Sequence, residues 1–466
     1  MAAADNSPPD VSGQSSIFAR VSRNIGWLAG STGFSAVTSV AYMALAARTL
    51  GPRGFGGYAL ILTYAQLIGN LVQFESWNAV IRYGATHLAD DDRAPLARLF
   101  GFTAMLDCAS AAVGILIAVI LVPVAGPYLH WSPVEIRYAT WFGAAFLLTT
   151  GATATGILRL FDRFDLLVYS DAAGPIVRVL GAVAGAWLGA GVAWFLGVWA
   201  LSAILQFLAQ WLAALWLGHR LAIGPRAWRK AASENRRIVP FMLKTNLSSS
   251  IGQFWLQCGT LAVGWVAGPV EAGGFRIAHR FAQAMTKPIN MITRALFPEF
   301  ARLVAARDHV TARNVLLRVS AVAASFAVLV VIVTGLGGTQ ILHLIAGRRF
   351  EFAQPFFFLL TIAAAINLAG FALTPFHNAH GRAGRVLRSG LVAVVVYAAL
   401  LAALMPSFGA RGAAYASIGA SVAIFVQLAL STSDILRKAD TRSAHEVAAG
   451  AAVASAEGVP DEFLEQ

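Results

Sequence analysis

The sequence predicts an all-α protein that crosses a membrane many times. Of its 466 residues, 58% are hydrophobic and only 12% are charged, whereas soluble domains usually carry about a quarter charged residues. Uncharged stretches long enough to span a bilayer recur along the whole chain, as in residues 180–199. A membrane β-barrel is excluded because its strands would alternate apolar and polar residues instead of running continuously apolar.

Apolar segments of about 20 residues between polar loops predict twelve transmembrane helices in two six-helix lobes. The expected spans are 25–47, 58–81, 97–122, 139–158, 171–189, 192–217, 241–266, 276–300, 314–335, 355–378, 386–405 and 412–433. The longest basic loop separates the first six from the last six. The predicted organisation is a cytoplasmic tail at 1–24, an N-lobe at 25–217, a basic cytoplasmic linker at 218–240, a C-lobe at 241–434 and a disordered cytoplasmic tail at 435–466.

The net charge of +12 follows this topology and does not predict a nucleic-acid partner. With the N-terminus inside, 23 of the 35 Lys and Arg residues fall on the cytoplasmic side, and 6 fall on the opposite side. Cytoplasmic loops of membrane proteins carry such an excess, so both termini are expected in the cytoplasm. The chain does not open with a basic segment, a short apolar core and a cleavage site, so we expect no removable signal peptide.

An internal repeat matches this division into halves. Residues 51–66, GPRGFGGYALILTYAQ, align with residues 268–283, GPVEAGGFRIAHRFAQ, at an offset of 217. A second match joins Gly189-Ala190 to Gly409-Ala410 at an offset of 220. Recurrence of helix-linking turns by chance is the alternative, but both matches fall at the same point of each half. Parallel repeats of this kind predict a substrate site between the halves.

The eighth predicted span carries a polar stripe within an arc of about 80° at 100° per residue. The stripe covers about 27 Å of helix, which is nearly the thickness of the hydrocarbon layer. Ionisable groups inside a span usually face a cavity or a partner, although the terminal arginines alone could reach the interface. The stripe therefore favours a cationic cavity. Its members are Arg276, Arg280, Gln283, Lys287, Asn290 and Arg294.

The second span carries the repeat-related polar face, which is neutral. The offset of 217 places Gln66 on Gln283 and Asn70 on Lys287, and Gln73 lies on the same face. We therefore expect a hydrophilic cavity suited to an anionic group.

Asp107 and Arg178 are ionisable residues within predicted spans of the N-lobe. Asp107 is either a proton or cation site, or a structural ion-pair partner of Arg178. Arg178 could also join the cavity or pair with Asp171. We expect no metal site, because His377 and His380 have no third ligand nearby in the sequence, and no cofactor. A phosphate-binding Walker loop is absent from the sequence, so any energy input is not ATP hydrolysed by this chain.

Three segments resemble one transporter family. ARTLGPRGFGGYA at 47–59, LFPEFARL at 296–303 and AHGR at 379–382 are similar to the polysaccharide transporters of the multidrug/oligosaccharidyl-lipid/polysaccharide flippase superfamily. The resemblance covers roughly residues 20–435. It implies two six-helix lobes around a central cavity.

The activity that the resemblance implies is lipid-linked sugar transport. Such proteins move undecaprenyl-pyrophosphate-linked oligosaccharide from the cytoplasmic to the periplasmic leaflet of the bacterial inner membrane, for O-antigen, capsule or exopolysaccharide synthesis. Cationic cavity residues are thought to engage the pyrophosphate, which fits Arg280, Lys287 and Arg294. Membrane lipids, a polysaccharide polymerase and glycosyltransferases are the further partners implied.

Three alternatives remain. A cation-coupled multidrug exporter of the same superfamily is disfavoured because its cavity would need a carboxylate, and the first span carries none. A lipid II flippase usually has fourteen spans. A membrane-embedded glycan-processing enzyme would need acidic catalytic residues or a large external loop, and the expected external loops are short.

Overall fold

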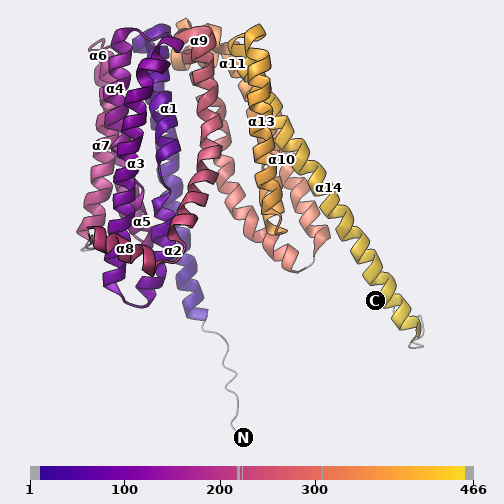
Figure 1. Cartoon of the computed structure of the whole chain (residues 1–466). Coiled ribbons are helices and arrows are strands. Elements are labelled where there is room, and N and C mark those ends of the chain that lie inside the picture. The colour runs from indigo at the N-terminus through magenta and orange to yellow at the C-terminus, as the bar shows by residue number, and fades with distance from the viewer. Residues whose placement is uncertain (1–10, 218–220, 223, 307, 457–466) are drawn as a thin grey trace. The chain divides into compact units, whose positions relative to one another are not determined.

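The computed structural model describes residues 11–217, 221–222, 224–306 and 308–456 (Figure 1). Every secondary-structure element of these residues is helical, so the predicted all-α class is confirmed. Eight described stretches are long and apolar enough to cross a membrane, which makes the chain a multi-pass membrane protein. The total of twelve spans and the six-plus-six division stay predictions.

The first of two compact units comprises residues 1–277 and 342–353. Within it, α6 and α7 pack on each other, and α1 packs against α4 and α6. Its helices are α1 (Val11–Val72), α2 (Ser76–Ala89), α3 (Arg93–Tyr128), α4 (Pro133–Leu147), α5 (Thr153–Leu160), α6 (Phe164–Trp187), α7 (Val192–Trp216), α8 (Pro225–Glu234), the first part of α9 (Ile238–Ala305), the end of α10 (His309–Ala346) and η1 (Arg348–Ala353).

The second unit comprises residues 278–341 and 354–466. In this unit α14 packs along α13 and α11. Besides the remaining parts of α9 and α10, its helices are α11 (Gln354–Ala369), α12 (Leu373–Ala379), α13 (Ala383–Phe408) and α14 (Ala410–Ala456).

Three predicted spans are interrupted. The span expected at 58–81 is divided between α1 and α2, the one at 139–158 between α4 and α5, and the one at 355–378 between α11 and α12. Interrupted helices are tolerated at membrane depth only where other groups satisfy the freed backbone atoms.

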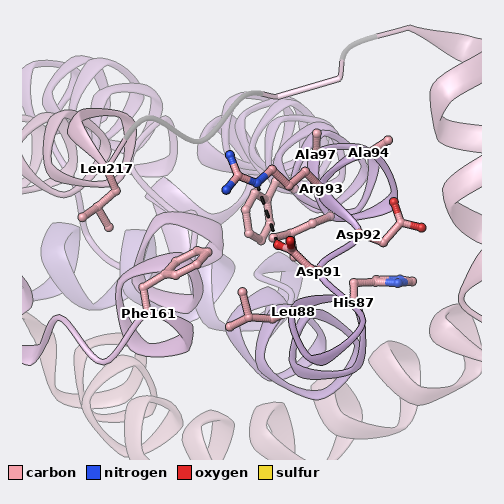
Figure 2. Close-up of a pocket in the computed structure, with 11 residues that line it drawn as sticks. His87, Leu88, Asp91, Asp92, Arg93, Ala94, Ala97, Phe161 and Leu217 are labelled. Atoms are coloured by element: carbon pink, nitrogen blue, oxygen red, sulfur yellow. Dashed lines mark ion pairs between the residues drawn. The ribbon is translucent and has the colours of Figure 1, made fainter.

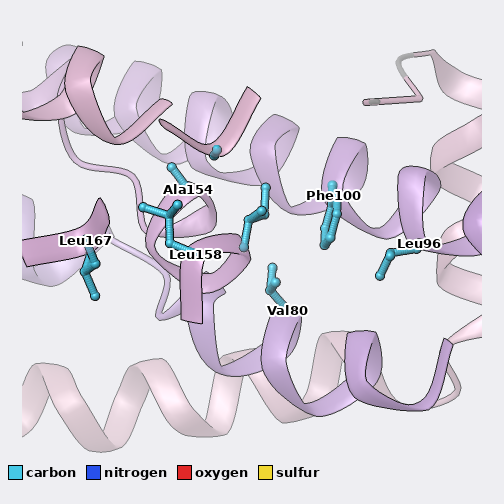
Figure 3. Packing of buried hydrophobic residues seen from close by; sticks show 8 residues of the cluster. Val80, Leu96, Phe100, Ala154, Leu158 and Leu167 are labelled. Carbon is cyan, nitrogen blue, oxygen red and sulfur yellow. The ribbon is translucent and has the colours of Figure 1, made fainter. Parts of the chain in front are cut away.

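An apolar cluster joins the short helices to the long ones in the first unit (Figure 3). Phe100 of α3 and Leu158 of α5 are each at most 1% exposed at its centre. The crossing of α5 on α2 is close, because a Cβ atom at Gly156 would lie 2.8 Å from the Trp77 Cα. The remaining members of the cluster are Val80, Leu96, Ala154, Ile157, Leu167 and Ala214.

The repeat that the sequence predicts is visible in the backbone. Gly51 breaks α1 at φ 65° and ψ 179°, and Gly268 breaks α9 at φ 85° and ψ 178°. The second pair also agrees, since Gly189 has φ 62° and Gly409 has φ 56°. Glycine adopts positive φ values without the steric cost that a side chain brings, which explains why glycine recurs at each position.

The two copies of the repeat motif touch each other within the first unit. A Cβ atom at Gly56 would lie 1.9 Å from the Pro269 carbonyl oxygen, and one at Gly273 would lie 3.0 Å from the Gly56 Cα. Gly56 and Gly273 are equivalent at the offset of 217. Contact between equivalent residues is the mark of a two-fold arrangement, here between two copies of one motif in a single chain.

Candidate functional site

A polar cluster forms around Arg276 in the first unit. The Arg276 Nη1 atom donates to the Thr63 hydroxyl oxygen at 2.6 Å and to Gln257 Oε1 at 3.2 Å. Its Nη2 atom donates to Gln66 Oε1 at 2.9 Å. Gln257 Nε2 is also 3.5 Å from Gln66 Oε1. One guanidinium thus organises three side chains, and each offers it a neutral oxygen.

The cluster is positioned by the two broken helices. Thr63 and Gln66 lie on α1 after the break at Gly51, and they share a helical face because three residues separate them. Gln257 precedes the break at Gly268 on α9, and Arg276 follows it. The repeat motif therefore brings one polar face of α1 against both arms of α9.

The structure brings together two of the predicted cavity residues, Gln66 and Arg276. The helical period of α1 would have been enough to find Thr63, which is fully buried and which the sequence analysis missed. The backbone carbonyl oxygen of Gln73 accepts a hydrogen bond from the Asn246 side-chain amide.

The other predicted cavity residues divide into two groups. Asn70, Arg280 and Gln283 are half-buried and engaged in further interactions. The remaining three lie outside the residues whose side chains are described, and their role in the cavity stays a prediction. They are Lys287, Asn290 and Arg294.

Asp107 anchors two of the helix interruptions. Its Oδ1 accepts a hydrogen bond from the Ser76 hydroxyl at the start of α2. Its Oδ2 accepts from the Thr153 hydroxyl at 2.7 Å and from the backbone N–H groups of Ala152 and Thr153, each at 3.0 Å. A carboxylate at the N-terminus of a helix satisfies donors that have no partner inside the helix. These contacts give Asp107 a structural role, and its predicted role in ion coupling is untested.

The contacts described for Arg178 lie apart from those of Asp107. Its guanidinium lies 4.5 Å from the centroid of the Trp199 ring, and its Nε donates to the Gly174 carbonyl oxygen at 3.3 Å. Asp171 accepts from the Gln206 and Gln210 amides at 3.1 and 2.7 Å. The predicted pairing of Arg178 with an acidic residue stays a prediction.

A separate cavity of about 740 Å³ opens at the ends of α2, α3 and α7 (Figure 2). Its wall combines apolar side chains such as Phe100 and Phe161 with the charged turn Asp91, Asp92 and Arg93. None of the stripe residues whose side chains the structure describes lines this cavity. Among the described residues, no three His, Cys, Asp or Glu side chains gather as metal ligands would.

Solved structures of similar fold are transporters. The structure titled as the inward-facing conformation of a multidrug resistance MATE family transporter of the MOP superfamily matches with a TM-score of 0.71 and 15% identity, over 87% of this chain and 96% of that one. A lipid II flippase MurJ in an inward closed conformation matches with a TM-score of 0.64 and 11% identity, over 87% of each chain. At these identities the likeness concerns the fold alone.

Sequence relatives narrow the assignment. The inner membrane protein YghQ of Escherichia coli (strain K12) is 28% identical over 340 residues, which are 72% of this chain and 94% of that protein. The fold defines a multi-pass, all-helical membrane protein. The family model described as "Polysaccharide biosynthesis protein" matches residues 21–304. The chain belongs to this family.

Proposed function

We propose that the protein is an inner-membrane flippase that moves undecaprenyl-pyrophosphate-linked oligosaccharide from the cytoplasmic to the periplasmic leaflet. The family description, polysaccharide biosynthesis, supports a role in making surface glycans. The fold of its structural neighbours is compatible with transport. The chain is then a transporter rather than an enzyme.

The observation that carries the proposal is the guanidinium of Arg276 among membrane-spanning helices. Burial of a pyrophosphate away from water is prohibitive unless cations and hydrogen-bond donors replace the lost hydration. Arg276 supplies charge, while the amide groups of Gln66 and Gln257 supply polar contacts. Such a surface suits an anionic group with sugars attached, and it repels a cationic drug.

The mechanism that we propose is alternating access around this polar surface. The head group enters from the cytoplasm, and the polyprenyl tail stays in the lipid. A membrane potential that is negative inside favours outward movement of an anion by about 2.3 kcal/mol per charge per 100 mV. The potential therefore assists the export step.

Complementation of a flippase-deficient bacterium tests the proposal. The strain must hold matching glycan machinery, and surface glycan and cytoplasmic lipid-linked intermediates are both measured. We expect the native chain to restore glycan and to lower the intermediates. Arg276→Gln should reduce export by about tenfold or more, and Arg276→Lys, which keeps the charge without the planar fork, should be intermediate.

Arg163→Gln is the matched control. It removes the same charge from a half-exposed turn, away from the Arg276 cluster, where Arg163 pairs with Asp165, so export should stay normal. Normal export by Arg276→Gln at equal expression would contradict the assignment of the site. If the native chain gave no rescue while conferring drug efflux on the same strain, the multidrug exporter would replace the flippase.

A further inference from the structure

One turn in each unit has the same backbone conformation and hydrogen bond. The turn between α5 and α6 contains Asp162 at φ 57°, and the turn between α12 and α13 contains Gly381 at φ 71°. In the first turn, the Arg163 N–H donates to the Leu158 carbonyl oxygen at 2.9 Å. In the second, the Arg382 N–H donates to the His377 carbonyl oxygen, also at 2.9 Å. An offset of 219 therefore relates the two turns residue by residue.

The charge of the first turn is balanced. The Arg163 guanidinium donates to both carboxylate oxygens of Asp165, at 3.0 and 2.9 Å. Asp165 also lies in the first turn of α6, where a negative charge interacts favourably with the helix dipole. Leu158 is fully buried in the apolar cluster of this unit. The first turn therefore has no need of an external anion.

The second turn has lost both features. Gly384 stands where the repeat places Asp165, and the first turn of α13 contains no acidic residue. His377 stands in place of Leu158 and is likewise fully buried. Its Nδ1 lies 2.8 Å from the Leu373 carbonyl oxygen, so Nδ1 carries the proton and Nε2 is left as an acceptor. His377 Nε2 and Arg382 Nη1 are both buried without a hydrogen-bond partner.

The surroundings of Arg382 favour a bound anion. Burial and the neighbouring Arg385 lower the pKa of Arg382, while Asp434 acts in the opposite direction. An arginine nevertheless stays protonated, and the Asp434 carboxylate also lies 3.6 Å from the Arg437 guanidinium. His380 and His309 stack nearby with ring centroids 6.4 Å apart. The N-terminus of α13 has no side-chain cap, and the Arg382 and Arg385 N–H groups already donate to carbonyl oxygens. The N–H groups of Ala383 and Gly384, which have no partner within the helix, are those available to an oxyanion.

We propose that the turn between α12 and α13 binds a phosphate group that carries one proton. Its unprotonated oxygens accept hydrogen bonds from Arg382 Nη1 and from the N-terminus of α13, and its P–OH donates to His377 Nε2. Inorganic pyrophosphate and a terminal phosphate monoester offer this combination. A phosphodiester head group offers only the acceptors. This site is separate from the Arg276 cluster and does not depend on the flippase proposal.

Isothermal titration calorimetry of the purified full chain with inorganic pyrophosphate, at pH 6 and at pH 8, tests the site. We expect tighter binding at pH 6 than at pH 8, because the lower pH favours the protonated form of the ligand, whose P–OH donates to His377 Nε2. Arg382→Gln should weaken binding by about tenfold or more, since a charge-assisted hydrogen bond is lost. His377→Leu, which installs the residue of the first turn, should also weaken binding.

Gly384→Asp is the sharpest variant. It installs the acid of the first turn next to Arg382, and a Cβ atom at Gly384 meets no heavy atom within 4 Å, so the fold should tolerate it. Loss of pyrophosphate binding in this variant supports the proposal even if Arg382→Gln fails to fold. Arg163→Gln removes the same charge as Arg382→Gln from the balanced turn and should leave binding unchanged.

The outcomes separate this site from others. Unchanged binding in Gly384→Asp and Arg382→Gln overturns the proposal, as does an equal loss in Arg163→Gln, which would reveal a general charge effect. Arg276→Gln tests whether the measured pyrophosphate sits in the Arg276 cluster instead. Binding of the variants to phosphatidylglycerol nanodiscs forms the second arm, and a loss there but not with pyrophosphate would assign the turn to phosphodiester lipids and overturn the protonated-phosphate site.

Discussion

The two copies of the glycine-proline motif share a backbone but differ in their surroundings. Both glycines, Gly51 and Gly268, adopt nearly the same dihedral angles. A Cβ atom at Gly51 would lie 3.6 Å from the Arg349 guanidinium, whereas one at Gly268 meets no heavy atom within 4 Å. The two copies thus share the broken helix, and they differ in the side chains that lie next to the break. The repeat specifies the fold, while the residues outside it differentiate the halves.

The largest effect is expected where the two copies touch. Gly56→Ala would place a Cβ atom 1.9 Å from the Pro269 carbonyl oxygen, and a backbone atom cannot yield as a flexible side chain can. We expect destabilisation by about 3 kcal/mol or more, measured as thermal unfolding followed by tryptophan fluorescence in detergent.

Gly197→Ala is the control for that substitution. It lies within α7, and its Cβ would meet no heavy atom within 4 Å. Because alanine is the better helix former, its effect should be neutral or stabilising by up to about 1 kcal/mol. If both alanine variants melted at the native temperature, the close contact between the motif copies would be refuted.

A smaller effect is expected at the breaks themselves. Gly51→Ala and Gly268→Ala would each force a side chain into a region that is essentially restricted to glycine, at a cost of about 1–3 kcal/mol. Because the dihedral angles agree, the two losses should be similar, and the same unfolding assay measures them. A silent Gly268→Ala beside a damaging Gly51→Ala would show that only the first copy requires its broken helix.

The sequence was informative about the fold because apolar length and glycine recurrence are local signals. The predicted repeat located all four positive-φ glycines that it named. The interruption between α4 and α5 was missed because it depends on Asp107, whose partners Ser76 and Thr153 are 31 and 46 residues away. The length of an apolar segment does not reveal a contact with a carboxylate so far away in the sequence.

The candidate site was predictable to the extent that it follows one helical face. Arg276 was found from the period of its own helix and Gln66 from the internal repeat, and the structure joins the two directly. Their shared neighbour Thr63 has a short, weakly polar side chain and was lost among the apolar residues of the span. The predicted contributions of Lys287 and Arg294 await a test by function, for which Lys287→Ala in the complementation assay is suited.

The smallest effect concerns how the two units balance their charges. In the first unit, Arg98 donates to both Glu234 carboxylate oxygens, at 3.0 and 2.6 Å, and these hydrogen bonds hold the pKa of Glu234 below its usual value of 4.5. A lowered pKa in the folded state means that the contribution to stability is complete above about pH 4.5. It is lost as the pH falls further, because the unfolded state then binds more protons.

Glu234→Gln should therefore cost about 1 kcal/mol at neutral pH and should flatten the loss of stability on the acid side. For comparison, Glu299 in the second unit lies 3.5 Å from the Arg302 guanidinium, and these side chains are 51% and 78% exposed. Solvent screens that pair, so Glu299→Gln should change neither the melting temperature nor its pH dependence. An equal effect of the two substitutions would mean that the pairing of Glu234 with Arg98 contributes no more than a solvated surface contact.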